Sequence, residues 1–420
     1  MKVTDIVPEG ILDNMSKIKI IGVGGGGCNA VTRLYTEGLK DVEFLICNTD
    51  LKALMASPVP DKIQLGSALT KGLGAGMSPE KGRNAALESL EEIKKYIGPN
   101  IEVVFITAGM GGGTGTGAAP VIAKAVKESG KLTISVVTYP RDNDGLDTIQ
   151  KAYEGIEELR KYTDSIIIVD NQKMYDYAGT MDIQATYKKA DDVLDTAVRG
   201  ISEIITSIGF VNVDLQDVTV VMRDSGMALV GTGLAKGENR AKEAAERAFT
   251  SPLLKDFDLN TAKNVLVNIT YSNKSPLLAS EDTLIMDLIR ESTGRGVSKL
   301  KRGLTTDNSL EEGEIAVTIL ATGFKVNNTP PARTRTYNNS DMVELTDGSA
   351  DTGGAVTLST GTTGDFQEGT LRELDTENIF TYAPDCIITD METETALARR
   401  ERLRKERERE RAAGSDGVSQ

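Results

Sequence analysis

The sequence predicts an α/β protein with a doubly wound first half, one long connecting helix and a smaller α+β second half. Three observations predict this architecture. Glycine-rich loops follow β-prone apolar runs and open helical patterns in the first half of the chain. Strand and helix patterns alternate there, as in a parallel sheet with helices on both faces. Residues 183–208 then carry apolar side chains at helical spacing over about 25 positions, long enough to join two domains.

Length and composition bound the class of protein. A chain of 420 residues is longer than a domain with a single hydrophobic core usually is, so we expect two folded domains with tails. No apolar run approaches the ~20 residues of a membrane span. Residues 1–15 contain no signal-peptide core and are expected to form a flexible segment. We therefore expect a cytoplasmic protein.

Charge and residue types exclude several kinds of chemistry. A net charge of −14 argues against a general nucleic-acid binder. The chain has no histidine, which excludes a Ser-His-Asp mechanism and imidazole metal ligands. Its three cysteines are too few and too scattered for a disulfide framework or a zinc site. Chemistry must come from carboxylates, hydroxyls, amides and a metal that arrives with the substrate.

The first glycine loop, residues 22–27, follows the β-prone run 17–21 and opens a helix at Cys28. Such a strand, loop and helix order presents helix amide groups to an anion. Alone, this loop also fits the dinucleotide fingerprint, with Asp50 after the next strand (residues 42–47) as the ribose acid. A dehydrogenase is therefore one open alternative.

The second glycine loop, residues 71–76, precedes Ser78 and Pro79. Serine is a good N-cap and proline suits the first helical position, so a helix is predicted from Pro79 to about Tyr96. A dinucleotide fold needs only one glycine loop. Several loops at one edge of a parallel sheet instead suit a mononucleotide with several phosphates.

The third glycine loop, residues 109–117, is the strongest signal in the chain. It follows the apolar run 103–106, opens the helical stretch after residue 117, and holds six glycines in nine positions. Glycines let a phosphate approach the backbone, while Thr114 and Thr116 keep hydroxyl donors there. The alternative without a functional role is a flexible linker. A Walker loop is not supported, because it would end in Gly-Lys-Ser or Gly-Lys-Thr, and neither is present here.

The remaining elements follow in order from β-prone runs and helical spacing. Strands are predicted at residues 132–137 and 165–169 around a helix at 146–162, in the βαβ manner. In the second half, strands are predicted at residues 227–230, 265–270 and 315–321, with helices at 238–249 and 281–291.

Two carboxylates follow the long helix. Asp214 and Asp217 are three residues apart, so on a helix both would lie on one face or at its N-terminus. A catalytic pair is one interpretation. The other interpretation is that Asp214 is an ordinary N-cap residue. The spacing of the two residues does not decide between these interpretations.

The last hundred residues change composition. After about Val326 the chain is rich in Asn, Thr, Asp, Ser and Gly, which cannot bury enough apolar surface to order itself. Residues 393–413 form a helix candidate in which residues 399–411 hold eight basic side chains against four glutamates. A solvated helix or an adhesive segment for acidic partners fits this pattern.

With these motifs assembled, the chain from about Lys17 to Phe324 closely resembles the FtsZ family, the tubulin-like GTPases of bacterial cell division. Residues 109–117 resemble the family's signature loop, and residues 212–218, Asn-Val-Asp-Leu-Gln-Asp-Val, its catalytic loop. Residues 222–228 and 237–241 are also similar to family sequence. The resemblance implies a tubulin/FtsZ-like fold.

The resemblance also implies six regions. These are a flexible segment (1–15), a nucleotide-binding domain (16–180), a central helix (181–209), a C-terminal activation domain (210–326), a disordered linker (327–390) and a charged, helical tail (391–420).

The resemblance implies that GTP or GDP is bound, with Mg²⁺ carried mainly by the nucleotide. Asp214, Asp217 and Asn212 would complete the active site of the adjacent subunit in a head-to-tail filament. The implied nucleotide contacts are Gly24, Gly25, Gly26, Gly27, Asn29, Gly74, Ala75, Gly76, Gly109, Met110, Gly111, Gly112, Gly113, Thr114, Gly115, Thr116, Gly117 and Asp144. No protein metal ligands are identified.

By the same resemblance, Asn171, Tyr187 and Asp191 would hold the guanine. Chemistry agrees for Asp191, because a carboxylate can accept the N1 and N2 protons of guanine, a pattern that adenine lacks. Tyr187 lies four residues earlier, on the same helix face, where it could stack on the base. Core packing is the alternative for Tyr187 alone.

Two regions depart from the family. Residues 138–145 lack the usual aromatic pair after proline, Asp144 stands where the family favours glutamate, and Thr148 stands where an arginine is expected. The tail lacks a clear copy of the apolar, proline-containing peptide that recruits membrane tethers in the family. Residues 379–384 resemble this peptide only weakly.

The leading hypothesis is a self-assembling GTPase that forms division filaments at the division site. Its partners would be further copies of itself and division proteins that bind the C-terminal tail. Nucleic acid is not expected, and membrane is expected only through a tether. The runner-up is a nucleotide-binding structural polymer with little turnover, which the divergent loop from Arg141 to Thr148 would permit.

Overall fold

The computed structural model describes residues 16–178, 183–206, 209–211, 213–251, 254, 259–294, 297–307 and 309–324, with the short segments 345–346 and 355–356. Two units are separated at Pro330. In the second unit, β12 (Leu345–Thr346) pairs with β13 (Ala355–Val356) in antiparallel fashion. The predictions for residues 1–15 and for the helical tail at 391–420 lie outside the described residues.

The first unit is built on one sheet of eleven strands, in the order β3-β2-β1-β4-β5-β6-β8-β11-β9-β10-β7. The first six strands of this order are parallel, as predicted. Their bounds are β1 (Ile18–Val23), β2 (Val42–Asn48), β3 (Lys62–Gln64), β4 (Val103–Gly109), β5 (Leu132–Tyr139) and β6 (Ser165–Asp170).

Side chains alternate between the two faces of the sheet along each parallel strand. Both faces are apolar and are covered by helices. In β1 every residue is buried, as expected for a central parallel strand. Ile18 and Ile20 join a core with α1 (Gly24–Thr36), α9 (Ile183–Thr206) and α10 (Leu215–Met222). Ile21 and Val23 face the opposite core, with α5 (Leu90–Ile97), α6 (Thr114–Glu128) and α7 (Leu146–Arg160).

The strand order also fixes where a ligand can bind. From β1 the chain moves outward to β2 and β3, and then returns to the other side of β1 at β4. In open α/β sheets, the crevice at such a reversal lies beyond the carboxyl ends of the strands and is the usual ligand site. The first and third glycine loops follow β1 and β4, the two strands that flank this reversal.

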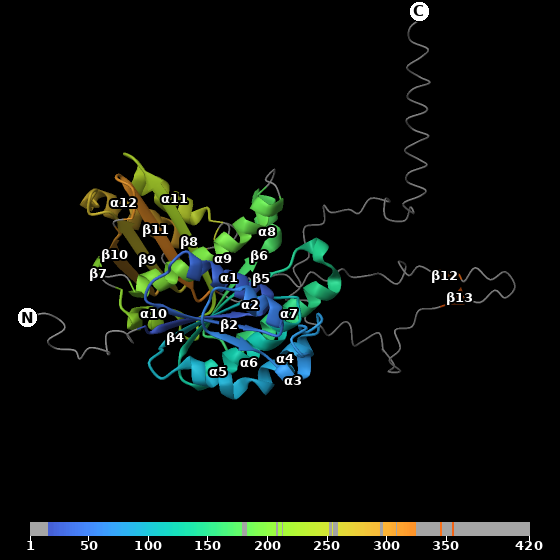
Figure 1. The fold of residues 1–420 in the computed structure, drawn as a ribbon. Coiled ribbons are helices and arrows are strands. Elements are labelled where there is room, and N and C mark those ends of the chain that lie inside the picture. Colours follow the sequence, from blue (N-terminus) through green and yellow to red (C-terminus); the bar gives the residue numbers. More distant parts are fainter. Residues whose placement is uncertain are drawn as a thin grey trace, which may run out of the picture. The chain divides into compact units, whose positions relative to one another are not determined.

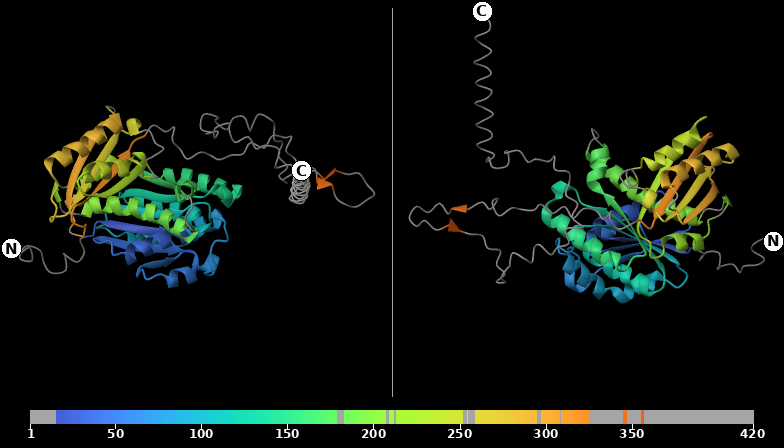
Figure 2. Two further views of the ribbon diagram at one scale, coloured as in Figure 1. Left: turned by 90° about the horizontal axis from the view of Figure 1, so that it is seen from above. Right: turned by 180° about the vertical axis from the view of Figure 1, so that it is seen from behind.

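The long helix and the last strands complete the unit. In Figures 1 and 2, α9 (green) lies between the first half, blue to teal, and the second half, yellow to orange. The second half contains β7 (Gly209–Val211), β8 (Gly226–Lys236), β9 (Asn264–Tyr271), β10 (Lys299–Thr306), β11 (Glu314–Thr322), α11 (Arg240–Phe249) and α12 (Ala279–Thr293). Strand β8 connects the halves through two residue pairs, Ser165 with Gly226 and Ile166 with Met227.

The structure corrects the predicted helix from Pro79 to Tyr96. It is two helices, α4 (Pro79–Glu88) and α5 (Leu90–Ile97), separated at Ser89. The Ser89 hydroxyl oxygen accepts a hydrogen bond from the Gly66 amide at 3.1 Å, and the helix breaks where this contact forms. Strands β3, β7 and β10 and the helices α2 (Leu51–Ala56), α3 (Ser67–Thr70) and α8 (Asn171–Ala178) were not predicted.

None of the helices in the described part of the chain combines the length and the apolar character that a membrane span requires.

Candidate functional site

The three glycine loops lie against one another, backbone to backbone. A Cβ atom added to Gly24 would lie 2.7 Å from the amide nitrogen of Gly115, which joins the first loop to the third. A Cβ atom on Gly113 would lie 2.9 Å from the Ala75 Cβ, which joins the third loop to the second. Only glycine allows these close approaches. The sequence prediction that several loops converge at one edge of the sheet therefore agrees with the geometry.

The helices that leave the first and third loops begin without caps. Neither α1 nor α6 has a side-chain cap or an acidic residue in its first turn. By contrast, Ser78 caps α4 by accepting the Lys81 amide at 3.3 Å. The first amide groups of α1 and α6 have no acceptor within their helices, and the helix dipole makes these ends positive. This arrangement suits an anion such as a phosphate.

The glycines of the loops include packed and open positions. Gly27 and Gly117 are the most tightly packed, because added Cβ atoms would lie 2.1 Å from the Thr107 carbonyl oxygen and 1.9 Å from the Pro79 carbonyl oxygen. Four glycines instead face space that no described atom fills within 4 Å of the added Cβ; they are Gly25, Gly74, Gly76 and Gly112. The packed positions hold the loops together, and the open positions border the space where a nucleotide would bind.

Two residues of the third loop stabilise it from within. The Met110 amide donates to the Thr138 carbonyl at 3.0 Å, and the Met110 side chain is buried. The Thr116 hydroxyl is also buried and accepts the Gly111 amide at 2.9 Å. Thr114 contacts Thr49 through their hydroxyls at 2.6 Å. These contacts shape the loop, a role the sequence did not reveal for Met110 and Thr116. Asn29 is exposed on α1, beyond the first loop.

The divergent loop contains a compact charge cluster. Asp144 accepts two hydrogen bonds from Arg141, one from the backbone amide at 2.9 Å and one from the guanidinium at 2.8 Å. Partial burial opposes ionisation, but the hydrogen bonds and charge of Arg141 outweigh it and lower the pKa of Asp144. The guanidinium also lies 4.4 Å from the ring centroid of Tyr175. Arg141 is thus held by two partners of its own chain.

The predicted base-binding residues lie on two helices in contact with each other, α8 and α9. Asn171 begins α8, and its Oδ1 atom is buried with no hydrogen-bond partner among the described residues. A buried acceptor without a partner is costly, so it suits a ligand donor. Tyr187 and Asp191 lie one turn apart on α9, and their side chains lie outside the described residues.

The predicted catalytic carboxylates lie at the N-terminus of α10. Asp214 is the N-cap, and its Oδ1 accepts the Asp217 amide at 2.7 Å. Asp217 also forms an ion pair of 2.5 Å with Lys301 on β10, and this hydrogen bond raises the pKa of Lys301. The capping interpretation of Asp214 is confirmed, and its second oxygen remains available for other contacts. Asn212 lies outside the described residues.

Helix α10, which carries this carboxylate pair, ends at the edge of the sheet opposite to the glycine loops. The C-terminal end of α10 contacts the amino end of β6, where the Ser165 hydroxyl donates to the Met222 carbonyl at 2.8 Å. The Asn264 side chain, at the amino end of β9, donates to the Val221 carbonyl at 3.5 Å. The glycine loops instead follow the carboxyl ends of β1 and β4, roughly 20 Å away along a strand of six residues. In Figure 1, α10 and the helices α3 and α4 lie at opposite sides of the unit.

Comparisons with known proteins identify the family of the chain. Residues 17–179 match the family model described as the Tubulin/FtsZ family, GTPase domain. Residues 226–325 match the model of the FtsZ family, C-terminal domain. The cell division protein FtsZ of Pseudomonas aeruginosa is 45% identical over 318 residues, covering 75% of this chain and 79% of that protein. The chain belongs to the FtsZ family.

Other relatives extend the comparison. The FtsZ of Wigglesworthia glossinidia brevipalpis is 42% identical over 325 residues, covering 77% of this chain and 83% of that protein. A solved FtsZ dimer from M. jannaschii has a TM-score of 0.69 at 38% identity, covering 77% of this chain and 93% of its own. A CetZ2 protofilament from Haloferax volcanii has a TM-score of 0.64 at 22% identity over 74% and 94% of the two chains, which supports the fold alone.

Membership of the FtsZ family makes the chain a GTPase with a nucleotide-binding site for GTP and GDP. The predicted tubulin/FtsZ-like α/β fold is confirmed. The dehydrogenase alternative is wrong, because the family is different and Asp50 caps α2 by accepting the Ala53 amide at 3.1 Å. Lys301, the partner of Asp217, was missed because it lies 84 positions further along the chain than Asp217.

The first testable prediction concerns Thr148, where the FtsZ family resemblance led us to expect an arginine. A Cβ atom on Gly111 would lie 2.6 Å from Thr148 Cγ2, so Thr148 packs directly on the third glycine loop. An arginine there would start beside the phosphate site, and Arg141 already has other partners. We expect Thr148→Arg to tighten GTP binding roughly fivefold, about 1 kcal/mol for a solvent-accessible charge pair. Thr148→Gln is the uncharged control; equal affinities in equilibrium titration would refute a missing charge.

Proposed function

We propose that this protein is a self-assembling GTPase that forms head-to-tail filaments for cell division and hydrolyses GTP at the contacts between subunits. The observation that carries the proposal is the separation of Asp214 and Asp217 from the glycine loops of the same chain. Carboxylates beside the chain's own triphosphate would repel it, whereas across a subunit contact they can orient a water molecule.

Exposed apolar side chains at the two edges support a head-to-tail contact. Near the glycine loops, Leu73 is 86% exposed, with Leu69 and Met77 also exposed. Around α10, Phe210 is 84% exposed and Val220 is half exposed. Exposed apolar patches of this kind mark interaction sites. Because the two patches differ, a contact between them is head-to-tail and can repeat from subunit to subunit, as a filament requires.

The relatives support the same proposal. The solved FtsZ structure from M. jannaschii is a dimer, and the Pseudomonas aeruginosa and Wigglesworthia relatives are named cell division proteins. We extend self-association and a role in division to this chain on that basis. A division-site position in the cytoplasm and division partners bound to the tail at 391–420 belong to the same proposal, as do the six regions that the resemblance implies.

Each part of the chain has a distinct task in this mechanism. The amides at the starts of α1 and α6 bind the phosphates and stabilise the charge that develops during transfer. From the next subunit, Asp217 and the second oxygen of Asp214 orient the attacking water, with Lys301 holding Asp217 in place. No cluster of three His, Cys, Asp or Glu side chains suited to a metal exists among the described residues, so Mg²⁺ would be held mainly by the nucleotide phosphates, whose charge it would neutralise.

The second testable prediction concerns the base. Asp191→Asn removes one acceptor and places an amide donor against the donors of guanine, which costs roughly 1–3 kcal/mol. GTP affinity should therefore fall more than about fivefold. Inosine triphosphate, which lacks the N2 amino group, is the matched probe, and the variant should discriminate less between the two nucleotides than the wild type. Unchanged GTP binding in equilibrium titration would show that Asp191 does not read the base.

A structural polymer with little turnover remains the second candidate. The observation that favours it is the divergent loop, where Arg141 is held by Asp144 and Tyr175. Turnover of GTP measured against protein concentration, with sedimentation of polymer in parallel, separates the two. A self-assembling GTPase gives turnover per subunit that rises steeply above the concentration at which polymer appears. Polymer with negligible turnover supports the second candidate, and turnover independent of concentration contradicts hydrolysis at subunit contacts.

A further inference from the structure

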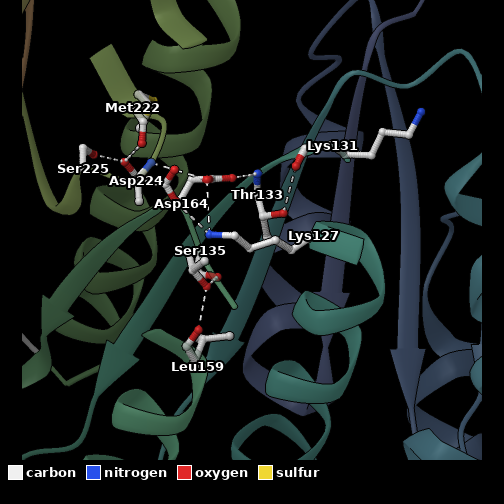
Figure 3. A network of polar contacts seen from close by, with 11 residues as sticks. Lys127, Lys131, Thr133, Ser135, Leu159, Asp164, Met222, Asp224 and Ser225 are labelled. Atoms are coloured by element: carbon white, nitrogen blue, oxygen red, sulfur yellow. Dashed lines mark hydrogen bonds and ion pairs between the residues drawn. The ribbon is translucent and has the colours of Figure 1, made fainter. Parts of the chain in front are cut away.

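A network around one buried carboxylate, that of Asp164, joins the end of α6 to the corner formed by residues 223–226 between α10 and β8 (Figure 3). Asp164, which precedes β6, is only 1% exposed. Its Oδ2 accepts the Thr133 amide at 2.9 Å, and its Oδ1 lies 3.4 Å from the Lys127 ammonium and 3.4 Å from the Asp224 amide nitrogen. The same ammonium lies 3.0 Å from the Asp224 carboxylate. Lys127 is therefore the cation shared by both carboxylates.

The corner between α10 and β8, residues 223–226, contains two residues with a positive φ. Asp224 has a φ of +49°, in the left-handed region, and Gly226 has a φ of +72°. A non-glycine residue in this region costs energy and persists where its surroundings fix it. The Asp164 main-chain oxygen supplies part of that support by accepting the amides of Ser225 and Gly226 at 2.9 and 3.0 Å. The Lys127 contact to the Asp224 side chain and the contact of the Asp224 amide to Asp164 Oδ1 add to it.

The charges of Lys127, Asp164 and Asp224 favour the contacts that these side chains make with one another. The hydrogen bond from Lys127 lowers the pKa of Asp224. Burial of Lys127 opposes its charge, but the hydrogen bond to Asp224 and the charge of Asp164 outweigh it and raise the pKa of Lys127. Without Lys127, the carboxylates of Asp164 and Asp224 would lose the one cation that both contact in the network.

The short helix α10 links this corner to the catalytic carboxylates. It spans eight residues, about 12 Å along its axis. Val218, Val221 and Met222 are buried in the core, so the helix moves as a rigid piece with the corner at its C-terminal end. Asp214 and Asp217 stand at its N-terminal end. A shift of the corner is therefore transmitted to both carboxylates.

From this geometry we infer that Lys127, through Asp164 and Asp224, is a positioning residue for GTP hydrolysis at the next subunit. It orients α10 so that Asp214 and Asp217 face the neighbour's γ-phosphate. This inference rests on the proposed function, because it needs an active site shared between subunits. Lys127 acts on the active site that its chain completes for a neighbour, and not on the GTP that its own chain binds.

The direct test replaces Lys127 in the full chain. Lys127→Met keeps the length of the side chain and removes its charge, Lys127→Arg keeps the charge, and Asp224→Asn removes the exposed partner without changing α6. Lys124→Met is the matched control, since Lys124 lies on the same helix, is exposed and is outside the network. We expect Lys127→Met to lower GTP turnover at saturating GTP about tenfold, as small misplacements of catalytic groups do. GTP affinity and sedimented polymer should stay within about twofold, with partial recovery in Lys127→Arg.

A mixing experiment separates positioning from general damage. The donor subunit is Gly112→Asp, which has intact carboxylates but a defective phosphate site, and the acceptor subunit is Asp214→Ala, which binds GTP. The mixture should turn over GTP where neither subunit does alone. Adding Lys127→Met to the donor should lower this recovered activity about tenfold, whereas adding it to the acceptor should leave it unchanged within about twofold.

Each outcome of the mixing experiment decides a different question. Equal losses in donor and acceptor would mean that Lys127 only stabilises the fold, and would overturn the inference. Full activity with the altered donor would overturn it as well, while leaving the shared active site intact. If the unaltered donor and acceptor recover no activity although they form polymer together, the shared active site is wrong and the inference falls with it. Thermal melting of each variant checks that the subunits are folded.

Discussion

Replacing Asp217 or Asp214 with alanine is expected to lower GTP turnover by about 100-fold while GTP affinity changes less than about twofold. Both carboxylates lie at the N-terminus of α10, a helix whose C-terminal end contacts the amino end of β6, whereas the phosphate loops of the same chain follow the carboxyl ends of β1 and β4. Removing them therefore leaves the chain's own GTP site intact. Filaments of these variants should persist, because hydrolysis is what normally lets subunits separate.

The control for this prediction distinguishes a chemical role from a structural one. Asp217→Asn keeps the shape of the side chain and leaves the N-cap contact between Asp214 and the amide of residue 217 in place, yet it cannot act as a base. It should lose nearly as much turnover as Asp217→Ala. The Asp214→Ala variant also loses the N-cap contact to the Asp217 amide, which is worth about 1 kcal/mol of stability. An Asp214→Ala or Asp217→Ala protein with full turnover in a steady-state phosphate-release assay would contradict the shared active site.

A second large effect is expected at Gly112 in the third glycine loop. Gly112→Asp places a carboxylate beside the phosphates, and like-charge repulsion should weaken GTP binding by at least about 30-fold, or roughly 2 kcal/mol. The change is compatible with folding, because no described atom lies within 4 Å of the added Cβ and the backbone there is not left-handed.

Gly112→Asn is the matched control, because asparagine has nearly the same size without the charge. Equilibrium titration with GTP should give it a much smaller loss of affinity than Gly112→Asp. If both variants bind equally weakly, bulk and not charge is responsible. If Gly112→Asp binds GTP normally, the phosphates do not lie beside this part of the loop. Gly111 is a poorer choice, because its φ of +100° and the contact to Thr148 strain any side chain there.

The sequence predicted the order of strand, glycine-rich segment and helix at β4 and α6 because these signals are local. The helix was predicted to begin after residue 117, whereas α6 begins at Thr114 and includes Gly115 and Gly117. The alternation of strands and helices similarly predicted the parallel sheet. The inward roles of Met110 and Thr116 could not be predicted, because the partner of Met110 lies on β5 and that of Thr116 depends on how the loop folds back on itself.

The opposite edge was harder to predict because its contacts join distant segments. Strand β10 carries Lys299, Lys301 and Arg302, so it does not resemble a buried strand, yet it pairs along its whole length with β9. The pairing of Asp217 with Lys301 depends on that strand. The break at Ser89 likewise depends on a contact to Gly66, which no local pattern reveals. Spacing alone also left the capping and catalytic roles of Asp214 open, and the structure supports the first directly.

If nucleotide binds at the uncapped starts of α1 and α6, as proposed, it also raises the free energy of unfolding of the subunit. Any ligand that binds only the native chain lowers the population of unfolded molecules by mass action, by about 2.7 kcal/mol when it is present at 100 times its dissociation constant. In the proposed function, the amides at these helix starts are the groups through which this linkage acts. We therefore expect proteases to cleave subunits without nucleotide faster than subunits that hold it, so that the supply of guanine nucleotide also affects how long each subunit survives.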